Sequence, residues 1–561
     1  MDHKSRNRSN TVLTIVIFSV AINGILLITA TLLDEIILRH HIHPATKTIF
    51  GLPLIEGLTL LYLSFFLLRR KRKALYFGIP AYLLILLINI IELFAIDNGH
   101  RQIIEFLLRG VVFPMIIIGG LLYYHEDFTV RSDTQSFKRS LKFTGIVLGI
   151  ALLYGVAGFM LMDKHDFRQE INFPQAILYT IDRFGLISKH ALVAHTLRAR
   201  LFTRSLSIIS VGALGYSLVS LFQPIRARFR SQTDNREHVL KLLELYGGNS
   251  EDFFKLWPQT KAYFFSEDIK SVLAFHVYLG VALCVGDPIG DQHSFGPLVE
   301  QYKQFCYVND WLPAFIHTNP DSTKLYRENE FTLQKIGEEA ILNIDHYKQN
   351  VQKNKYFRHI INRFTKLGYE TELLKPPHSP DLINRLAIIS KEWLSQPGRA
   401  ERGFMMGYFT PEYMQICPIL VARDADGEIQ AFINQIVSFD KHEANFDLLR
   451  HTNSSPGNIN DYLLNGFIHY ASESGFRRLN LGLCPLTGLN KDEADQTIID
   501  STLRFAYANG DRFYSFSGLY RFKSKYEPEW SSRYIAYRNG IRGFTKTANA
   551  LIRAMSKIPR R

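Results

Sequence analysis

The chain has 561 residues, more than one hydrophobic core normally organises, so two or three structural units are expected. Hydrophobic residues make up 47% and charged residues 21%, and the charged residues concentrate in the second half, which predicts a membrane part followed by a soluble part. The net charge of +13 fits a polyanionic partner, either nucleic acid or an anionic lipid surface. The four cysteines are widely spaced without a C-x-x-C pair, which argues against a disulfide framework and a zinc site: Cys284, Cys306, Cys417 and Cys484.

Six apolar stretches in the first half are each about as long as the roughly 20 helical residues needed to cross a bilayer. They lie near residues 11–33, 51–68, 75–97, 104–124, 143–162 and 205–223. The first follows a basic N-terminus and resembles a signal peptide. Its length and the spans that follow predict an anchor instead.

Lysines and arginines cluster in the segments 69–73, 131–142 and 226–230, on the same predicted side as the basic N-terminus. By the positive-inside rule, both termini are expected in the cytosol of a multi-pass cell-membrane protein. The segment 163–204 is expected outside although it carries basic residues such as Lys164, Arg168, Lys189, Arg198 and Arg200. An amphipathic helix lying on the membrane is an open alternative for it.

Two polar features of this half have ordinary explanations. Arg109 lies inside the fourth apolar stretch, where snorkelling or pairing with Glu92 is favoured over a functional role. His40, His41 and His43 follow the first stretch without a fitting carboxylate spacing, so an interfacial loop is favoured over a metal site.

From about residue 237, short β-like runs alternate with amphipathic helices. Two similar successions of hairpin, strand and helix predict tandem copies of an acetyltransferase-like (GNAT) fold in a cytosolic α/β domain. The predicted divisions are a membrane domain of about six helices at 1–230, a first acyltransferase-like subdomain with a basic linker helix at its end at 237–375, and a second subdomain carrying the catalytic motifs at 376–561.

A basic helix of about five turns is predicted between the two copies, ending at Gly368. Its positive charges are almost unopposed, so a phosphate-binding role is weighed equally against a solvated face. If this helix binds phosphate, we expect it to contact transfer RNA through six basic residues: Lys348, Lys353, Lys355, Arg358, Arg363 and Lys366.

Several common nucleotide and metal motifs are missing from the sequence. It contains no phosphate-binding G-x-x-x-x-G-K-[ST] loop, no dinucleotide fingerprint and no H-E-x-x-H pair. The loop with which common acetyltransferases hold the coenzyme A pyrophosphate is also missing. We therefore expect an acyl donor other than coenzyme A, and no metal or cofactor.

Residues 403–537 resemble the C-terminal catalytic domain of the phosphatidylglycerol lysyltransferase (multiple peptide resistance factor) family. The resemblance rests on GFMMGYF at 403–409, DLLRH at 447–451, DYL at 461–463, NLGLCPLTG at 480–488, GLYRFKSKY at 518–526, PEW at 528–530 and RYIAY at 533–537. Weaker similarity extends back to GDP at 286–288.

The resemblance implies transfer of an aminoacyl group, with lysyl expected, from aminoacyl-tRNA to the glycerol hydroxyl of phosphatidylglycerol. Such a product lowers the negative charge of the membrane surface, a route to antimicrobial peptide resistance. The implied partners are aminoacyl-tRNA, phosphatidylglycerol and the bilayer, with homo-oligomerisation open. A peptidoglycan-type tRNA-dependent aminoacyltransferase and a non-enzymatic lipid flippase or transporter are the alternatives.

The candidate site residues come from these blocks. Asp447 and Arg450 lie three residues apart, which in a regular strand points them to opposite faces unless a bulge or strand end intervenes. Asp461 falls at a predicted helix start, where it is either a chemical group or an N-cap. These three are the catalytic candidates, and the substrate-binding candidates are Tyr462, Gly482, Pro485, Tyr520, Lys523, Lys525, Trp530 and Arg533.

Overall fold

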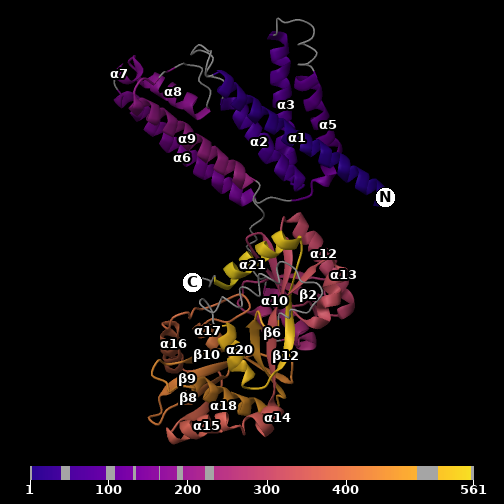
Figure 1. The fold of residues 1–561 in the computed structure, drawn as a ribbon, viewed down its shortest axis with the longest axis vertical. Helices are drawn as coiled ribbons and strands as arrows, with labels where there is room; N and C mark the ends of the chain where they lie inside the picture. Colours follow the sequence, from indigo (N-terminus) through magenta and orange to yellow (C-terminus); the bar gives the residue numbers. More distant parts are fainter. Residues whose placement is uncertain are drawn as a thin grey trace. The chain divides into compact units, whose positions relative to one another are not determined.

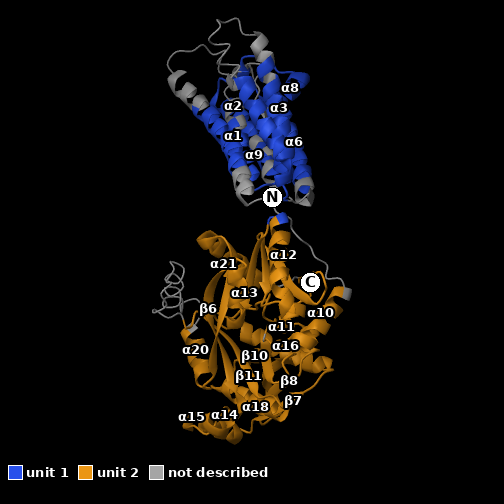
Figure 2. Cartoon of the chain, turned by 90° about the vertical axis from the view of Figure 1, so that its right-hand side faces the viewer, with its two compact units in different colours: residues 1–226, 308–310 blue, residues 227–307, 311–561 orange. Residues whose placement is uncertain are grey.

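The computed structural model describes residues 3–38, 51–95, 108–130, 134–162, 164–185, 192, 194–221, 233–249, 251–488 and 516–556. The chain divides into two compact units (Figure 2). Unit 1 contains residues 1–226 and 308–310, and unit 2 contains residues 227–307 and 311–561. His40, His41 and His43 lie outside the described residues, as do the side chains of Glu92 and Arg109.

Unit 1 is helical, and each of the six apolar stretches contributes to a helix. The main helices are α1 (His3–Leu38), α2 (Gly51–Leu68), α3 (Arg72–Ala95), α5 (Phe113–Tyr123, preceded by a π-turn at Leu108–Val112), α6 (Thr134–Leu161) and α9 (Leu197–Leu221). Two shorter helices, α7 (Lys164–Phe167) and α8 (Phe173–Gly185), form in the segment expected outside the membrane.

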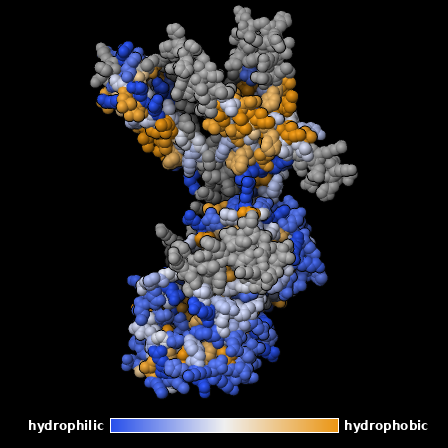
Figure 3. All heavy atoms as spheres, viewed as in Figure 1, coloured by the Kyte–Doolittle hydropathy of each residue, from blue (hydrophilic) through white to orange (hydrophobic). Residues whose placement is uncertain are grey.

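Among the described residues, two helical segments are long and apolar enough to cross a membrane, Thr11–Thr29 and Arg139–Leu161. Their outer faces carry large apolar side chains, such as Ile15 with 59% and Leu153 with 72% of its surface exposed. Figure 3 shows hydrophobic surface over the helices of unit 1 and a mostly hydrophilic described surface on unit 2. Exposed apolar surface of this kind suits contact with lipid.

Glycines allow a close approach between α1 and α2. A Cβ on Gly24 would lie 2.7 Å from the carbonyl oxygen of Gly57, and a Cβ on Gly57 would lie 2.7 Å from that of Gly24. Small residues at such crossings let helix backbones pack without intervening side chains, a common device in membrane helices.

Unit 2 is built around one twelve-stranded sheet (Figure 1). The strand order is β1-β2-β3-β5-β12-β6-β11-β10-β9-β8-β7, with β4 paired to β2. The strands are β1 (Ala262–Phe265), β2 (Ser271–Tyr278), β3 (Val281–Val285), β4 (Ile289–Gly290), β5 (Leu312–Thr318), β6 (Thr332–Asn343), β7 (Glu370–Leu374), β8 (Ile419–Arg423), β9 (Ile429–Ile436), β10 (Glu443–His451), β11 (Arg478–Pro485) and β12 (Glu529–Tyr537).

The sheet contains two similar halves. In each half antiparallel strands lead to one parallel pair, β3 with β5 in the first and β10 with β11 in the second. This is the succession expected of tandem acyltransferase-like folds. The last strands are exchanged, because β12 lies between β5 and β6 while β6 pairs with β11. The exchange makes the two halves parts of one continuous sheet.

Helices cover both faces of this sheet. They are α10 (Thr233–Tyr246), α11 (Asp252–Leu256), α12 (Phe295–Val308), α13 (Thr323–Glu328), α14 (Ile344–His346), α15 (Lys355–Lys366), α16 (Pro380–Leu394), α17 (Pro411–Met414), α18 (Ile459–Glu473), α20 (Phe516–Ser524) and α21 (Gly540–Ser556). One core cluster joins α16, α17 and α21 to the sheet, and another joins α15 and α18 to it. All four cysteines are buried and none of them forms a disulfide.

The sequence predicts one continuous basic helix in the segment between the two copies, and this prediction is wrong because the helix is interrupted. Short α14 runs into a π-turn at Tyr347–Val351, and α15 begins only at Lys355. The turn buries Tyr347 and Val351 in the core while α15 buries Phe357, Ile360 and Phe364. The buried residues of the π-turn and those of α15 therefore do not lie on one face of a single continuous helix. The chain leaves the helical conformation between them, at residues 352–354.

The predicted boundary between residues 375 and 376 remains a prediction. By strand pairing, β7 lies beside β8 and so joins the second half of the sheet.

Candidate functional site

The parallel strands β10 and β11 diverge in the second half of the sheet. Their pairing covers only residues 443–445 with 478–480, although β10 continues to His451 and β11 to Pro485. Directly beyond the last pair, each strand shifts register against its other neighbour, β10 between Phe446 and Leu449 and β11 between Asn480 and Leu483. Bulges of this kind re-aim side chains and leave backbone groups free of the ladder.

The bulge in β10 turns Asp447 and Arg450 toward the same face of the sheet. Asp447 accepts a hydrogen bond of 2.8 Å from the hydroxyl of Tyr413, and Arg450 lies over the ring of Trp393 in α16. Both partners belong to the elements that cover this face. Of the two geometries left open by the sequence, the structure has the bulged one.

The Asp447 carboxyl is enclosed, and burial raises its pKa to about 6. The Tyr413 hydroxyl, the backbone N–H of Gly407 and the charge of Arg450 act in the opposite direction, and they do not outweigh the burial. Gly407 approaches so closely that a Cβ there would lie 1.9 Å from Oδ2 of Asp447. The result is a carboxylate that is ionised at neutral pH and still basic enough to take a proton.

Arg450 is held by a carboxylate of its own. Its guanidinium donates bonds of 2.8 and 2.6 Å to the two oxygens of Glu401 and a further short bond to the hydroxyl of Ser390. The side chain is 3% exposed. A paired, buried guanidinium of this kind fixes the loop around residue 401 and contributes a fixed positive charge beside Asp447.

Asp461 lies in α18 and is surrounded by donors. Its carboxylate accepts bonds of 2.6 Å from Lys525, 2.7 Å from the hydroxyl of Tyr526 and 3.0 Å from that of Tyr356. The helix begins after Asn458, whose backbone is left-handed and whose side chain makes no capping bond. Asp461 therefore anchors α15, α18 and the end of α20 to one another, and its oxygens are already occupied.

Lys523 lies beside the bulge in β11. Its ammonium group donates to the carbonyl oxygens of Gly482 at 2.8 Å and Leu483 at 3.1 Å. Burial lowers its pKa to about 8. Gly482 has a φ of +83°, and its N–H donates to the side-chain oxygen of Asn480 at 2.7 Å. The glycine thus permits the backbone conformation that presents two carbonyls to Lys523.

The other predicted substrate residues are divided between two places. The rings of Tyr520 and Trp530 stack with their centroids 4.8 Å apart, and Pro485 ends β11 opposite Gly337. Tyr462 instead points toward α15 and β7, where it stacks on Phe364 and donates to the carbonyl of Tyr369. Tyr462 thus lies in the packing around α15, while its assignment to substrate stays a prediction.

The first half of the sheet has a crevice of its own, beyond the ends of β3 and β5. It is a pocket of about 720 Å³ whose wall includes Asp287, Asn319, Ser531 and Arg533. Asp287 accepts from both the backbone and the side chain of Asn319, at 3.0 and 2.9 Å. This pocket places Arg533 in the first crevice, whereas Lys523 lies at the second strand divergence.

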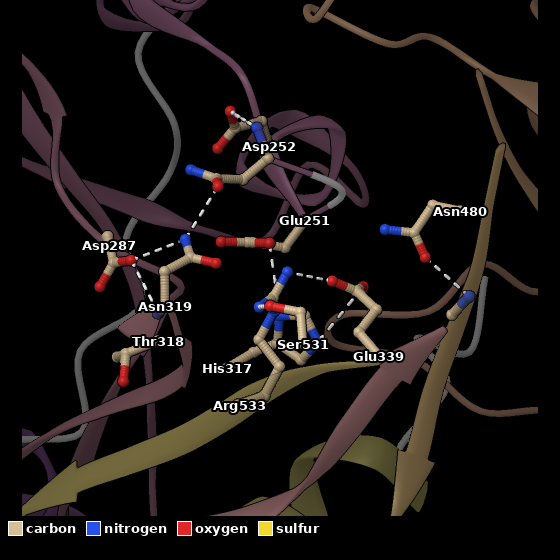
Figure 4. A network of polar contacts seen from close by, with 12 residues as sticks. Glu251, Asp252, Asp287, His317, Thr318, Asn319, Glu339, Asn480, Ser531 and Arg533 are labelled. Atoms are coloured by element: carbon tan, nitrogen blue, oxygen red, sulfur yellow. Dashed lines mark hydrogen bonds and ion pairs between the residues drawn. The ribbon is translucent and has the colours of Figure 1, made fainter. Parts of the chain in front are cut away.

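A buried charge network lies behind this pocket (Figure 4). His317 stands between Glu251, at 3.3 Å, and Glu339, at 3.6 Å, and Glu339 also pairs closely with Arg533. Burial favours the neutral imidazole, but the two glutamates outweigh it and raise the pKa of His317. Sequence reasoning named Arg533 but missed Glu251, His317 and Glu339, because none of these three lies in a block that carries the family resemblance.

The predicted basic residues mostly reach solvent. Lys353, Lys355, Arg358, Arg363 and Lys366 are exposed on and just before α15. Lys348 lies in the π-turn instead, where its ammonium donates to the hydroxyl of Ser472 at 2.9 Å. No acidic residue occurs from 347 to 369, so the exposed face of α15 is positively charged. Within the described ranges, no three histidine, cysteine or acidic side chains form a group that could hold a metal ion.

Residues 240–537 match the family model described as "Phosphatidylglycerol lysyltransferase, C-terminal". This segment is more than half of the chain and includes both the pocket of the first half of the sheet and the divergence of β10 and β11. The chain belongs to this family. The sequence-based resemblance, which rested on residues 403–537, is therefore confirmed and extends through the first half of the sheet.

Relatives in the family are longer than this chain. The phosphatidylglycerol lysyltransferase of Bacillus subtilis (strain 168) is 27% identical over 513 residues, which cover 90% of this chain and 55% of the relative. That of Staphylococcus aureus (strain MRSA252) is 25% identical over 493 residues, 85% of this chain and 54% of the relative. The chain thus spans about half the length of the curated relatives it matches.

Two solved structures are similar to part of this chain. A DUF2156 C-terminal domain from Agrobacterium fabrum is 26% identical with a TM-score of 0.51, covering 58% of this chain and 98% of that domain. The L-PGS structure from Bacillus licheniformis is 29% identical with a TM-score of 0.49, and the match covers 57% of this chain and 97% of that structure.

Proposed function

We propose that this chain transfers an aminoacyl group, with lysyl the expected one, from aminoacyl-tRNA to the glycerol hydroxyl of phosphatidylglycerol. The lipid oxygen attacks the ester carbonyl, a new C–O bond forms, and the bond to the tRNA ribose oxygen breaks. The hydroxyl proton passes to a general base and then to the departing ribose oxygen. The products are aminoacyl-phosphatidylglycerol and free tRNA, and the energy of the donor ester drives the exchange.

The observation that carries the proposal is the placement of Asp447 in a chain of this family. Its carboxylate lies at the divergence of β10 and β11, and burial brings its pKa to about 6, which suits a general base at neutral pH. Asp461 is the weaker candidate, because its oxygens already accept from Lys525, Tyr526 and Tyr356. We therefore assign the base to Asp447 and a positioning role to Arg450, whose guanidinium is held by Glu401 and whose charge favours the ionised form of Asp447.

Positive charge and aromatic surface support the binding of both substrates. The exposed face of α15 suits the phosphates of transfer RNA, whose binding to proteins is dominated by such contacts. Lys523 and Lys525 are assigned to phosphate groups on the second half of the sheet, and Arg533 to a phosphate group in the pocket of the first half. The Tyr520–Trp530 stack is assigned to a base or the lipid headgroup. In this proposal unit 1 anchors the enzyme as a six-span cell-membrane protein with both termini in the cytosol.

The test compares lipids from cells that carry the wild-type chain, Asp447→Asn or no chain. We expect lysyl-phosphatidylglycerol, measured by mass spectrometry of lipid extracts, only with the wild type. The purified full chain in phosphatidylglycerol liposomes should also consume lysyl-tRNA and ignore acetyl-coenzyme A. Aminoacylation of a peptide precursor instead of the lipid would replace this proposal with the peptidoglycan-type alternative.

A further inference from the structure

The C-terminal helix α21 has a solvent face that none of the steps above uses. Gly543, Thr547, Ala550 and Ala554 are buried, and the helix packs on the first half of the sheet with Phe544, Leu551 and Met555 at the margin of the core. The chain also turns tightly into this helix, since a Cβ on Gly543 would lie only 1.6 Å from the carbonyl oxygen of Arg538, which directly follows β12. The helix is therefore fixed in its rotation about its own axis.

That fixed rotation leaves an apolar edge in solvent. Ile541 is 54% exposed and Ile552 is 66% exposed. At about 100° per residue these two isoleucines fall within roughly 20° of each other on the helical wheel, three turns apart along the helix. They continue the apolar sector that begins in the core with Met555 and Phe544.

A row of basic side chains borders this edge. Arg542, Lys546 and Arg553 are exposed, and they lie within about 40° of one another on the same wheel, roughly 100° from the isoleucines. Small polar residues separate the row from the apolar edge: Thr545, Asn549 and Ser556. Residues 530–561 contain eight lysines and arginines and no aspartate or glutamate. An apolar edge beside an exposed basic row is the pattern of a helix lying in the interface of an anionic membrane.

We propose that α21 docks unit 2 on an anionic bilayer surface, with Ile541 and Ile552 in the boundary between headgroups and acyl chains and the basic row on lipid phosphates. The same chain contains helices apolar enough to enter that bilayer, so the surface is within reach of a tethered domain. The exposed isoleucines favour lipid over RNA, because RNA phosphates would meet the basic row without covering them. The proposal deepens the proposed function, since docking brings unit 2 to its lipid acceptor.

The test uses the full chain in liposomes, with an environment-sensitive fluorophore attached to the cysteine of the variant Ile552→Cys. Labelling is directed to this position because the four native cysteines are buried. A matched control carries the probe on Leu367→Cys, which replaces an exposed apolar residue at the end of α15. With phosphatidylglycerol present, we expect blue-shifted emission and quenching by a lipid-borne quencher at position 552 and neither at 367. Liposomes of phosphatidylcholine alone should give a weak signal at both.

The triple variant Arg542→Gln, Lys546→Gln, Arg553→Gln should lose the dependence on anionic lipid, because each basic residue at such a surface contributes about fivefold to binding. Its turnover on a short-chain, micellar phosphatidylglycerol should equal that of the wild type while its KM on liposomes rises. Equal, water-like emission at 552 and 367 would overturn the docking proposal. So would a signal at 552 that responds to uncharged tRNA and not to lipid, which would indicate an RNA surface. The fluorescence needs no turnover, so docking without lysyl transfer would count against the proposed function alone.

Discussion

Replacing Asp447 with asparagine should lower activity and raise stability together. The ordinary pKa of an aspartate is 3.8, and burial raises that of Asp447 to about 6. A tenfold change in ionisation corresponds to about 1.4 kcal/mol, so the ionised carboxylate costs the folded state about 3 kcal/mol at neutral pH. This cost is absent below pH 4, grows between pH 4 and 6, and is constant above, because the unfolded chain gives up its proton first.

Asparagine keeps the shape and removes the charge. Its side-chain oxygen can still accept from Tyr413, but it holds the Gly407 N–H less well, a loss of about 1 kcal/mol. We therefore expect Asp447→Asn to be about 1 to 2 kcal/mol more stable than the wild type at pH 7.5 and no more stable at pH 4. Turnover should fall by about a hundredfold or more, since the proton acceptor is lost.

The assay pairs thermal unfolding in detergent at pH 4 and 7.5 with the rate of lysyl-lipid formation at saturating lysyl-tRNA. The wild-type rate should rise about tenfold per pH unit below 6 and level above it. Asp461→Asn is the matched control. It breaks the bond to Lys525 and weakens those to Tyr526 and Tyr356, so it should lose stability by about 1 to 3 kcal/mol yet keep the same pH profile. A folded Asp447→Asn enzyme that retains a tenth of the wild-type turnover would refute the base assignment.

Three further outcomes are expected. Gly407→Ala should lower both turnover and the midpoint of thermal unfolding, because its Cβ would lie 1.9 Å from Oδ2 of Asp447. Gly457→Ala should behave as wild type, because no atom lies within 4 Å of its Cβ. Equal effects of the two substitutions would argue against the close approach at Gly407. The triple variant Lys355→Gln, Arg358→Gln, Lys366→Gln should reduce the slope of log tRNA affinity against log salt concentration by about 2 in filter binding. Lys324→Gln on α13 is the neutral control, and an unchanged slope in the triple variant would remove α15 from the tRNA site. His317→Gln should destabilise the protein more at pH 6 than at pH 9, as measured by thermal unfolding at both pH values. The stabilisation from the raised pKa of His317 is complete below the ordinary value near 6.5 and is lost as pH rises through the folded value. A loss of stability that does not change with pH would mean that His317 is neutral in the folded protein.

Local pattern was enough to predict much of the architecture. Apolar stretches of helical length marked six helices of unit 1, and β-like runs alternating with amphipathic helices from about residue 237 marked the sheet and helices of unit 2. The motif blocks identified the family, and through them Asp447 and Arg450 became candidates. These signals are readable because hydrophobic periodicity, turn residues and motif spacing are properties of neighbouring residues.

The pairing of distant segments was decided only by tertiary structure. Whether Asp447 and Arg450 share a face depended on a bulge in β10, which no residue spacing specifies. The partners that set their chemistry come from far along the chain: Tyr413 is 34 residues from Asp447, and Glu401 is 49 residues from Arg450. The Arg533–Glu339 pair spans 194 residues and exists because β12 is inserted between β5 and β6. A pKa depends on burial and on such partners, so Asp447 could be named from the sequence, while its basicity follows only from the folded packing around it.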